Sequence, residues 1–271
     1  METGKTNNIK AKTFNHELAE QYHLSVQIGL QQLRYCITSI NTNAIEYFKE
    51  FIVNDNITKL ISSDEILKLN FAYSTVIFTN YTHTLVPSKI FSEKNKQEIL
   101  KLNSHVYEVI KSDEIKEINA HLIYTIPKEI NNFVSAFFPN AKQKSQQTLL
   151  IEQFSKMDNQ GENAYLHLNA EILNITVFKN KRLLFNNSFQ AKTKEDILYF
   201  TLFVFEQLKI DTEKVNTILY GNISERDENH QLLYEYIRNI NFGPHHKKIK
   251  FPTKFNKIKG HQFYSLFSHI K

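Results

Sequence analysis

The sequence predicts an α/β protein made of two halves with similar organisation. Three observations favour this class. Segments with β-type alternation precede segments with helical periodicity, the same order of elements occurs twice, and the length of 271 residues fits two domains of about 150 residues each. The most polar break is residues 156–163 (KMDNQGEN). We therefore expect a first domain at residues 1–158 and a second domain at residues 159–271.

In the first half, strands come before helices. Residues 24–37 (LSVQIGLQQLRYCI) hold two β-type runs on either side of Gly29, which tolerates positive φ, so they predict a hairpin. Residues 44–54 fit either a strand or a helix. Residues 62–70 (SSDEILKLN) open with a Ser-x-x-Glu cap and predict a helix. The other predicted elements are strands at 74–79 and 120–126 and helices at 92–102, 128–138 and 142–155.

The second half repeats this order. Residues 164–178 and 182–191 alternate as strands around a turn at 179–181. Residues 193–209 predict a capped, strongly apolar helix with aromatic residues on more than one face. Such a helix is either buried between neighbouring elements or exposes an aromatic patch to a partner. A strand at 215–220 and a helix at 231–239 follow.

The composition is typical of a globular protein. Hydrophobic residues make up 41% and charged residues 23%, which excludes disorder, collagen and coiled coil. No run approaches the roughly 18 apolar residues of a membrane span, and the first thirty residues lack the apolar block of a signal peptide, so we expect a cytoplasmic protein. The single cysteine, Cys36, makes an internal disulfide or a cysteine metal cluster impossible, and its apolar strand indicates a core position.

The two hairpins can be superposed, so that VQIG (residues 26–29) matches LHLN (residues 166–169). This duplicated unit of three strands, helix, strand and helix resembles the actin-like ATPase superfamily, in which two ribonuclease-H-like α/β domains face each other across a nucleotide cleft. Residues 165–208 are similar to an uncharacterised bacterial family of unknown function with this fold, akin to the pilus-assembly actin-like proteins. The resemblance runs from about Leu24 to about Phe242 and implies the same architecture here.

The resemblance also implies where a nucleotide would bind, and this sequence departs from the pattern there. The superfamily carries an Asp-x-Gly turn in each hairpin, whose amides hold phosphate and whose carboxylates bind magnesium through water. Gln27 and His167 replace the two carboxylates, while Gly29 and Asn169 stand at the glycine positions. Only Gly221 matches the glycine-rich turn that contacts the adenosine. An amide and an imidazole lack the anionic oxygens that magnesium prefers.

From these replacements we predict a degenerate nucleotide cleft with no catalytic residue, no metal ligand and no bound ATP or magnesium. Gln146 and Gln147 lie where active relatives orient a water molecule, but two adjacent glutamines match that pattern by chance, and we expect a place on the helix surface. The expected function is a non-catalytic actin-like scaffold or regulatory protein with an unknown protein partner. One alternative is a divergent ATPase or small-molecule kinase that takes metal ligands from elsewhere, such as Asp158 or Asp227.

A second alternative is nucleic-acid binding through a basic tail. No acidic residue follows Glu235, so the residues after it carry +8 and residues 1–235 carry −3 of the formal net charge of +5. The phenylalanines of this tail are spaced to dock on a core, with its lysines in solvent, and we favour this structural role. The lysines that would contact a nucleic acid are Lys247, Lys248, Lys250, Lys254, Lys257 and Lys259.

Other groupings fit structural roles better than chemistry. Gly4-Lys5-Thr6 (residues 4–6) ends like a phosphate-binding loop, but the glycine and strand that should precede it are missing. The set His16, Glu20 and His23 lacks a further metal ligand. The pair at residues 245–246 (HH) is typical of a polar surface turn. Carboxylates at 64–65, 113–114 and 195–196 fall at predicted helix starts, where a negative charge interacts favourably with the helix dipole and stabilises the helix.

Overall fold

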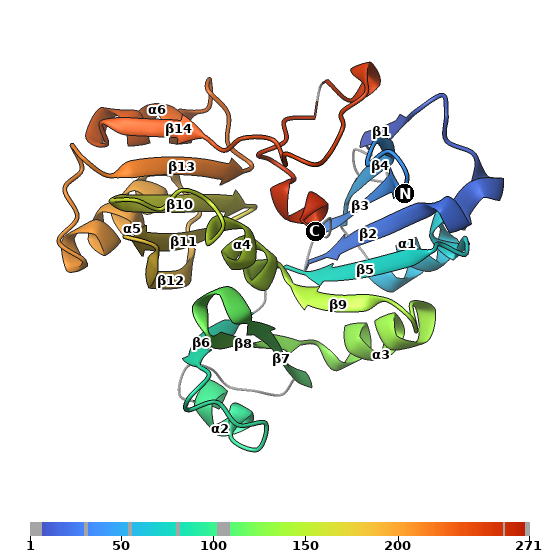
Figure 1. Ribbon diagram of the computed structural model, residues 1–271, viewed down its shortest axis with the longest axis horizontal. Coiled ribbons are helices and arrows are strands. Elements are labelled where there is room, and N and C mark those ends of the chain that lie inside the picture. The colour runs from blue at the N-terminus through green and yellow to red at the C-terminus, as the bar shows by residue number, and fades with distance from the viewer. Residues whose placement is uncertain are drawn as a thin grey trace.

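The structure is a computed structural model that describes residues 7–29, 32–53, 56–79, 82–101, 109–256 and 258–268. Two mixed sheets, one from each half of the chain, lie on either side of a central helix, and a third, smaller sheet adjoins the first (Figure 1). Residues 4–6 and Lys257 lie outside the described residues. Among those described, no helix is both long and apolar enough to cross a membrane.

The first sheet has the order β1-β4-β3-β2-β5-β9. Strand β2 runs antiparallel to β3 and parallel to β5. Helices α1 (Ile57–Ser63) and α3 (Lys128–Phe137) share one buried cluster with the sheet, so they cover one of its faces. The strands are β1 (Asn7–Lys10), β2 (Tyr22–Ile28), β3 (Gln32–Ser39), β4 (Ile45–Ile52), β5 (Tyr73–Phe78) and β9 (Lys142–Ser145).

The second sheet has the order β12-β11-β10-β13-β14. This is the order of β4-β3-β2-β5-β9 in the first sheet, with the same parallel and antiparallel pairings. The duplication predicted from the sequence is therefore confirmed. The elements are β10 (Glu162–Asn169), β11 (Ile172–Lys179), β12 (Arg182–Gln190), α5 (Lys194–Gln207), β13 (Asn216–Gly221), α6 (Glu228–Tyr236) and β14 (Asn239–Phe242).

The third sheet, in the order β6-β8-β7, is inserted between β5 and α3. Alternation along β8 joins it to the rest of the protein, because Leu122 and Tyr124 enter the large core of the first half. Ile123 points the other way, into a small core with Leu100. The elements are β6 (His83–Pro87), α2 (Lys96–Lys101), β7 (Val109–Ile115) and β8 (Ala120–Ile126).

Two further segments connect the halves. Helix α4 (Gln146–Phe154) lies between the sheets, and the C-terminal segment, residues 243–268, passes from the second half back to the first (Figure 1). Phe255 and Phe267 are fully buried in a core that includes Phe48 of β4. The lysines of this segment at positions 247, 248, 250, 254 and 259 are exposed, as the docking prediction required. Short 3-10 helices occur at His16–Gln21, Glu65–Lys68, Lys116–Ile118, Thr253–Phe255 and Tyr264–Phe267.

Several predicted elements need correction. The helix predicted at 142–155 is strand β9 followed by α4, because residues 142–145 pair with β5 and Ser145 caps the helix. The helix predicted at 62–70 begins earlier, at Ile57, and Asp64 caps a separate 3-10 helix. The segment at 44–54 is mainly strand β4, and 164–178 divides into β10 and β11. Strands β7 and β14 were not predicted.

The helix α5 is capped as predicted. Thr193 accepts a hydrogen bond from the Asp196 N–H, and the Asp196 side chain accepts one from the Thr193 N–H. The helix is not buried on all sides, because Tyr199 and Phe203 are exposed on its outer face. The predicted boundary at residues 158 and 159 stays a prediction, and the structure adds that the C-terminal segment packs mainly on the first sheet.

Candidate functional site

The second hairpin turn contacts the first half of the protein. Asn169, at the end of β10, donates from Nδ2 to Thr79 Oγ1 at 2.8 Å. Thr79 follows β5, and its N–H donates to Ile28 O at the end of β2. A Cβ added to Gly29 would lie 2.9 Å from Thr79 Cγ2, so the glycine permits this close packing. The side chain at the second turn therefore bonds directly to the first half.

A chain of buried hydrogen bonds continues from this bridge. Thr79 Oγ1 donates to Gln146 Oε1 at 2.7 Å, and Gln146 Nε2 donates to Ser265 Oγ at 2.9 Å. These bonds link the second hairpin turn, the first sheet, helix α4 and the C-terminal segment in turn. Gln146 and Gln147 are 2% and 5% exposed, so the prediction that they lie on the helix surface is wrong. Helix α4 lies between the two sheets, so neither side of it is left open to solvent (Figure 1).

A buried arginine forms a second bridge, which the sequence analysis missed. Arg34 of β3 is the cross-strand neighbour of Gln27 and is 4% exposed. Its guanidinium pairs with Glu50, and its Nη2 donates to Asn222 Oδ1 of the second half at 3.3 Å. Gln32, with its amide in the orientation that satisfies both of its polar atoms, donates to Asn169 Oδ1 at 2.9 Å and accepts from Arg34. Only three-dimensional placement reveals this arginine as part of the cleft.

The two residues that replace carboxylates are buried beside these bridges. Gln27 is 1% exposed and His167 is 2% exposed. Neither polar atom of the Gln27 amide has a hydrogen-bond partner among the residues that the structure describes, and neither has His167 Nδ1. Burial, with Arg34 nearby, lowers the pKa of His167 to about 3, so its imidazole is neutral at physiological pH. Among the described residues, no three metal-ligating side chains come together.

The turn at Gly221 is closed by the C-terminal segment. Gly221 has φ of +82°, and a Cβ there would lie 1.9 Å from Leu168 O, so only glycine fits this approach to β10. The Gly221 N–H donates to His261 O at 2.9 Å. Phe263 lies two residues further on, with its ring 4.9 Å from the Arg34 guanidinium carbon. Residues 261–265 therefore fill the space between this turn and the first sheet.

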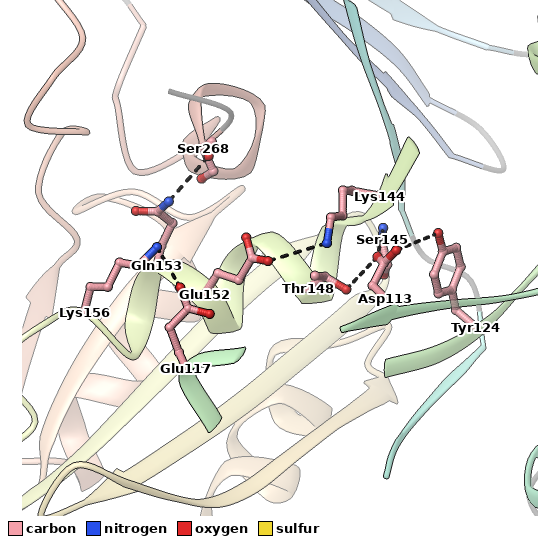
Figure 2. A network of polar contacts seen from close by, with 10 residues as sticks. All are labelled: Asp113, Glu117, Tyr124, Lys144, Ser145, Thr148, Glu152, Gln153, Lys156 and Ser268. Atoms are coloured by element: carbon pink, nitrogen blue, oxygen red, sulfur yellow. Dashed lines mark hydrogen bonds and ion pairs between the residues drawn. The ribbon is translucent and has the colours of Figure 1, made fainter. Parts of the chain in front are cut away.

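Polar contacts hold α4 at both of its ends (Figure 2). At the start of the helix, Asp113 of β7 accepts from the Ser145 N–H and from the Thr148 hydroxyl, each at 2.8 Å. Burial raises the pKa of the Asp113 carboxyl, and the hydrogen bonds to its charged form oppose that rise. At the other end, Gln153 Nε2 donates to Ser268 O at 3.4 Å. The helix that carries Gln146 is thus fixed against both the small sheet and the C-terminal segment.

The carboxylates proposed for a divergent enzyme lie apart. Asp227 caps α6, accepting from the Asn229 N–H at 2.8 Å, and lines a pocket beside Arg34. Asp158 is exposed and lines a different pocket. Neither carboxylate lies at a hairpin turn.

The remaining motifs have structural roles. Cys36 is fully buried, and burial raises the pKa of its thiol. His23 shares a hydrogen bond with the Thr75 hydroxyl at 2.9 Å, and burial lowers its pKa to about 4. His245 is exposed, but His246 is 6% exposed and packs against Tyr264, so the prediction of a surface turn holds for only one of the two histidines.

Comparisons with known proteins agree with this architecture. The model of a family described as protein of unknown function (DUF3822) matches residues 11–240. A protein of unknown function with an actin-like ATPase fold from Bacteroides thetaiotaomicron superposes with a TM-score of 0.78 at 21% identity, covering 94% of this chain and 99% of that one. A chain of the PilM–PilN type IV pilus biogenesis complex superposes with a TM-score of 0.60 at 12% identity, covering 91% and 96%. No curated protein matches the chain. The protein has the actin-like ATPase fold.

Proposed function

The chain belongs to the DUF3822 family of proteins of unknown function, and we propose from the geometry of this chain that it is a non-catalytic, cytoplasmic actin-like protein. In this proposal it acts as a scaffold or regulator that binds a protein partner. The cleft that holds magnesium and nucleotide in active members of the superfamily is used here as a structural joint between the two halves. In this proposal the protein has the fold of the superfamily but does not catalyse phosphoryl transfer.

One observation carries this proposal: the second hairpin turn bonds directly to the first half. In an active member, the phosphates lie between the two turns. Here the Asn169 Nδ2 to Thr79 Oγ1 distance of 2.8 Å leaves no room between these side chains for a phosphate group. The Gly221 N–H is also unavailable to a nucleotide, because it donates a hydrogen bond to His261 O. Magnesium finds no carboxylate at residues 27 and 167, so the residues present do not fit a metal–nucleotide complex.

Support for a protein partner comes from the fold comparison. A structure with this fold, at a TM-score of 0.60, is that of a protein complex, PilM–PilN. A rigid pair of joined halves offers a partner a fixed surface, because the polar bridges and the C-terminal segment hold the sheets together. Only this general role is taken from the comparison. The kind of partner that this chain binds has to be inferred from its own surface.

The test is nucleotide binding by thermal unfolding and calorimetry. A ligand at 100 times its dissociation constant adds about 2.7 kcal/mol to stability. We expect no shift of the melting temperature and no heat of binding with millimolar ATP and magnesium. The double variant Gln27→Asp/His167→Asp should remain unable to bind, because the side chains in the cleft are still present. Magnesium-dependent ATP turnover that is lost on substitution of residues 27 or 167 would refute the proposal.

A further inference from the structure

A pocket of about 580 Å³ lies between the two halves, beside the bridge at Thr79. Residues 82–85, at β6, line one side of it, and residues 186–190 of β12 line the other. Gln147 of α4 forms part of its wall. In Figure 1, β6 and β12 lie near each other below α4. Gln146, which takes part in the hydrogen bonds between the halves, also lines this pocket.

Both strands that line the pocket are edge strands. Within the described part of the chain, β12 ends the second sheet and pairs only with β11, while β6 ends the small sheet and pairs only with β8. The outer side of an edge strand presents backbone N–H and C=O groups that are ready to pair with another strand. The pocket therefore lies between two sheet edges from different halves of the protein, bridged at one point by Ser188 Oγ and His83 Nε2, 3.5 Å apart.

The lining of the pocket has one titratable side chain, His83. None of its fifteen residues is Asp, Glu, Lys or Arg, although 23% of the chain is charged. Its walls carry side-chain amides and hydroxyls, together with the apolar groups of Leu85 and Phe189. A charged ligand would lose hydration here and find no Asp, Glu, Lys or Arg to pair with, whereas a neutral chain of amides would lose little.

Two acceptor groups in this wall have no hydrogen-bond partner among the described residues. They are Gln147 Oε1, on a side chain that is 5% exposed, and Asn186 Oδ1. Both atoms are shielded from solvent, so a donor can pair with them only when the side chains that cover them move, and such a bond would then offset their lost hydration. Backbone N–H groups of an incoming chain are donors of this kind.

From these observations we propose that this pocket binds an extended, uncharged peptide segment of a partner protein, which adds to β12 as a further strand. Main-chain hydrogen bonds to the edge supply affinity, and side chains that alternate along the peptide reach the Leu85 and Phe189 groups. In the protein alone, the Ser188 N–H donates to Asn187 Oδ1 at 2.9 Å, so a side chain covers this edge amide until a peptide replaces it. The inference rests on the proposed function, because it names the surface through which the scaffold holds its partner.

The experiment selects ligands without assuming a sequence. A phage-displayed library of random decapeptides is panned against the full-length protein, and the enriched peptides are synthesised and measured by calorimetry. We expect enriched peptides that lack charged residues over at least four consecutive positions. In NMR spectra, their binding should shift the amide signals of residues 186–190 most strongly.

Matched variants locate the site. Asn187→Lys places a charge at the exposed edge of β12 and should weaken peptide binding at least tenfold. Asn241→Lys makes the same change on β14, the opposite edge of the same sheet, and should leave binding unchanged. Ser188→Pro removes one edge donor and should also weaken binding. Circular dichroism establishes that each variant is folded, and Asn187→Lys, which alters an exposed side chain, decides the result if Ser188→Pro does not fold.

Other outcomes overturn the inference in distinct ways. An absence of enriched peptides, or binding that is equally sensitive to both lysine variants, removes it. A dimer in sedimentation that is abolished by Asn187→Lys would show that a second copy of the chain occupies the edge instead. None of these results involves nucleotide, so failure here leaves the non-catalytic cleft standing. Nucleotide binding by the cleft would count against the proposed function alone.

Discussion

Gln27 is a buried polar residue whose amide is unpaired. A buried glutamine needs two kinds of partner, a donor for its oxygen and an acceptor for its nitrogen. Among the described residues it has neither, even though its cross-strand neighbour is Arg34. The residue therefore contributes a desolvation penalty without a compensating hydrogen bond.

This penalty predicts that an apolar residue of similar size is tolerated better. We expect Gln27→Met to raise the free energy of unfolding by about 1–2 kcal/mol, because it removes two unpaired buried atoms and nearly conserves volume. Urea denaturation at pH 7 measures the change. The matched control is Gln32→Met, which should destabilise the protein because Gln32 bonds to Asn169 and Arg34. A loss of stability on Gln27→Met would mean that the amide has a partner after all.

His167 predicts a pH dependence of stability. Its pKa is about 3 in the folded protein, against 6.5 as the ordinary value. Between these pH values the unfolded chain binds a proton that the folded protein does not, so stability falls as pH falls. The slope is about 1.4 kcal/mol per pH unit for one such group. We expect His167→Gln to remove this slope, measured as the difference between wild-type and variant denaturation curves from pH 7 to pH 4. Parallel curves would contradict the assignment.

Part of the cleft could be predicted from the sequence. The match of VQIG with LHLN identified the four turn positions, because short motifs in duplicated strands keep their place in the fold. The partners of those residues were not predictable. Thr79 and Arg34 reach the turns from neighbouring strands, and Ser265 comes from a segment 119 positions beyond Gln146. Such contacts depend on how whole elements pack, which no local pattern encodes.

At the scale of elements, the helices and strands with a clear apolar periodicity were predicted, and strands without it were missed. The two hairpins and α5 combine clear periodicity with caps, and they were found. Strands β9 (KQKS) and β14 (NINF) have only four residues each, and β7 (VIKSDEI) has a polar centre. All three lie at sheet edges and lack the apolar alternation that marks a strand. Their partners, rather than their own residues, make them strands.

The C-terminal segment has the composition of a basic arm and the packing of a core element. Its lysines at positions 247, 248, 250, 254 and 259 are exposed, while Phe255, Leu266 and Phe267 are fully buried against the first sheet. Deleting everything after Phe242 would therefore expose a hydrophobic core rather than free a binding arm. Charge-changing substitutions of its lysines are the cleaner way to examine nucleic-acid binding.

This packing predicts a large effect from a single substitution. We expect Phe267→Ala to lower the free energy of unfolding by about 3–5 kcal/mol, because it leaves a cavity in a fully buried cluster. Lys259→Ala, eight residues away in the same segment and exposed, should change it by less than about 0.5 kcal/mol. Both are measured by urea denaturation. Similar small effects for the two variants would show that the segment is not a core element.

At the scale of the whole molecule, two segments pack on both halves of the protein. The C-terminal segment contributes Phe267 to the core of the first half, and its Tyr264 ring lies 4.8 Å from Tyr220 of the second sheet. Helix α4 stacks Phe154 on Tyr165 of β10, with ring centroids 4.3 Å apart, and also places Leu149 in the first-half core. Each segment packs on both halves, so separating the halves exposes apolar surface on both. A protein that opens and closes around a nucleotide would avoid this cost.

This shared packing predicts that the two halves unfold together. Native-state hydrogen exchange should give the strand amides of β3 and β11, one from each sheet, the same free energy of opening, equal to the global value from urea denaturation. Tyr264→Ala should weaken the joint, so that β11 exchanges through a lower-energy opening while β3 keeps a higher protection. The control, Tyr234→Ala, removes an exposed tyrosine of α6 and should preserve equal protection. Different opening energies for the two sheets in the wild-type protein would show that the halves are independent, and the cleft would then be free to open.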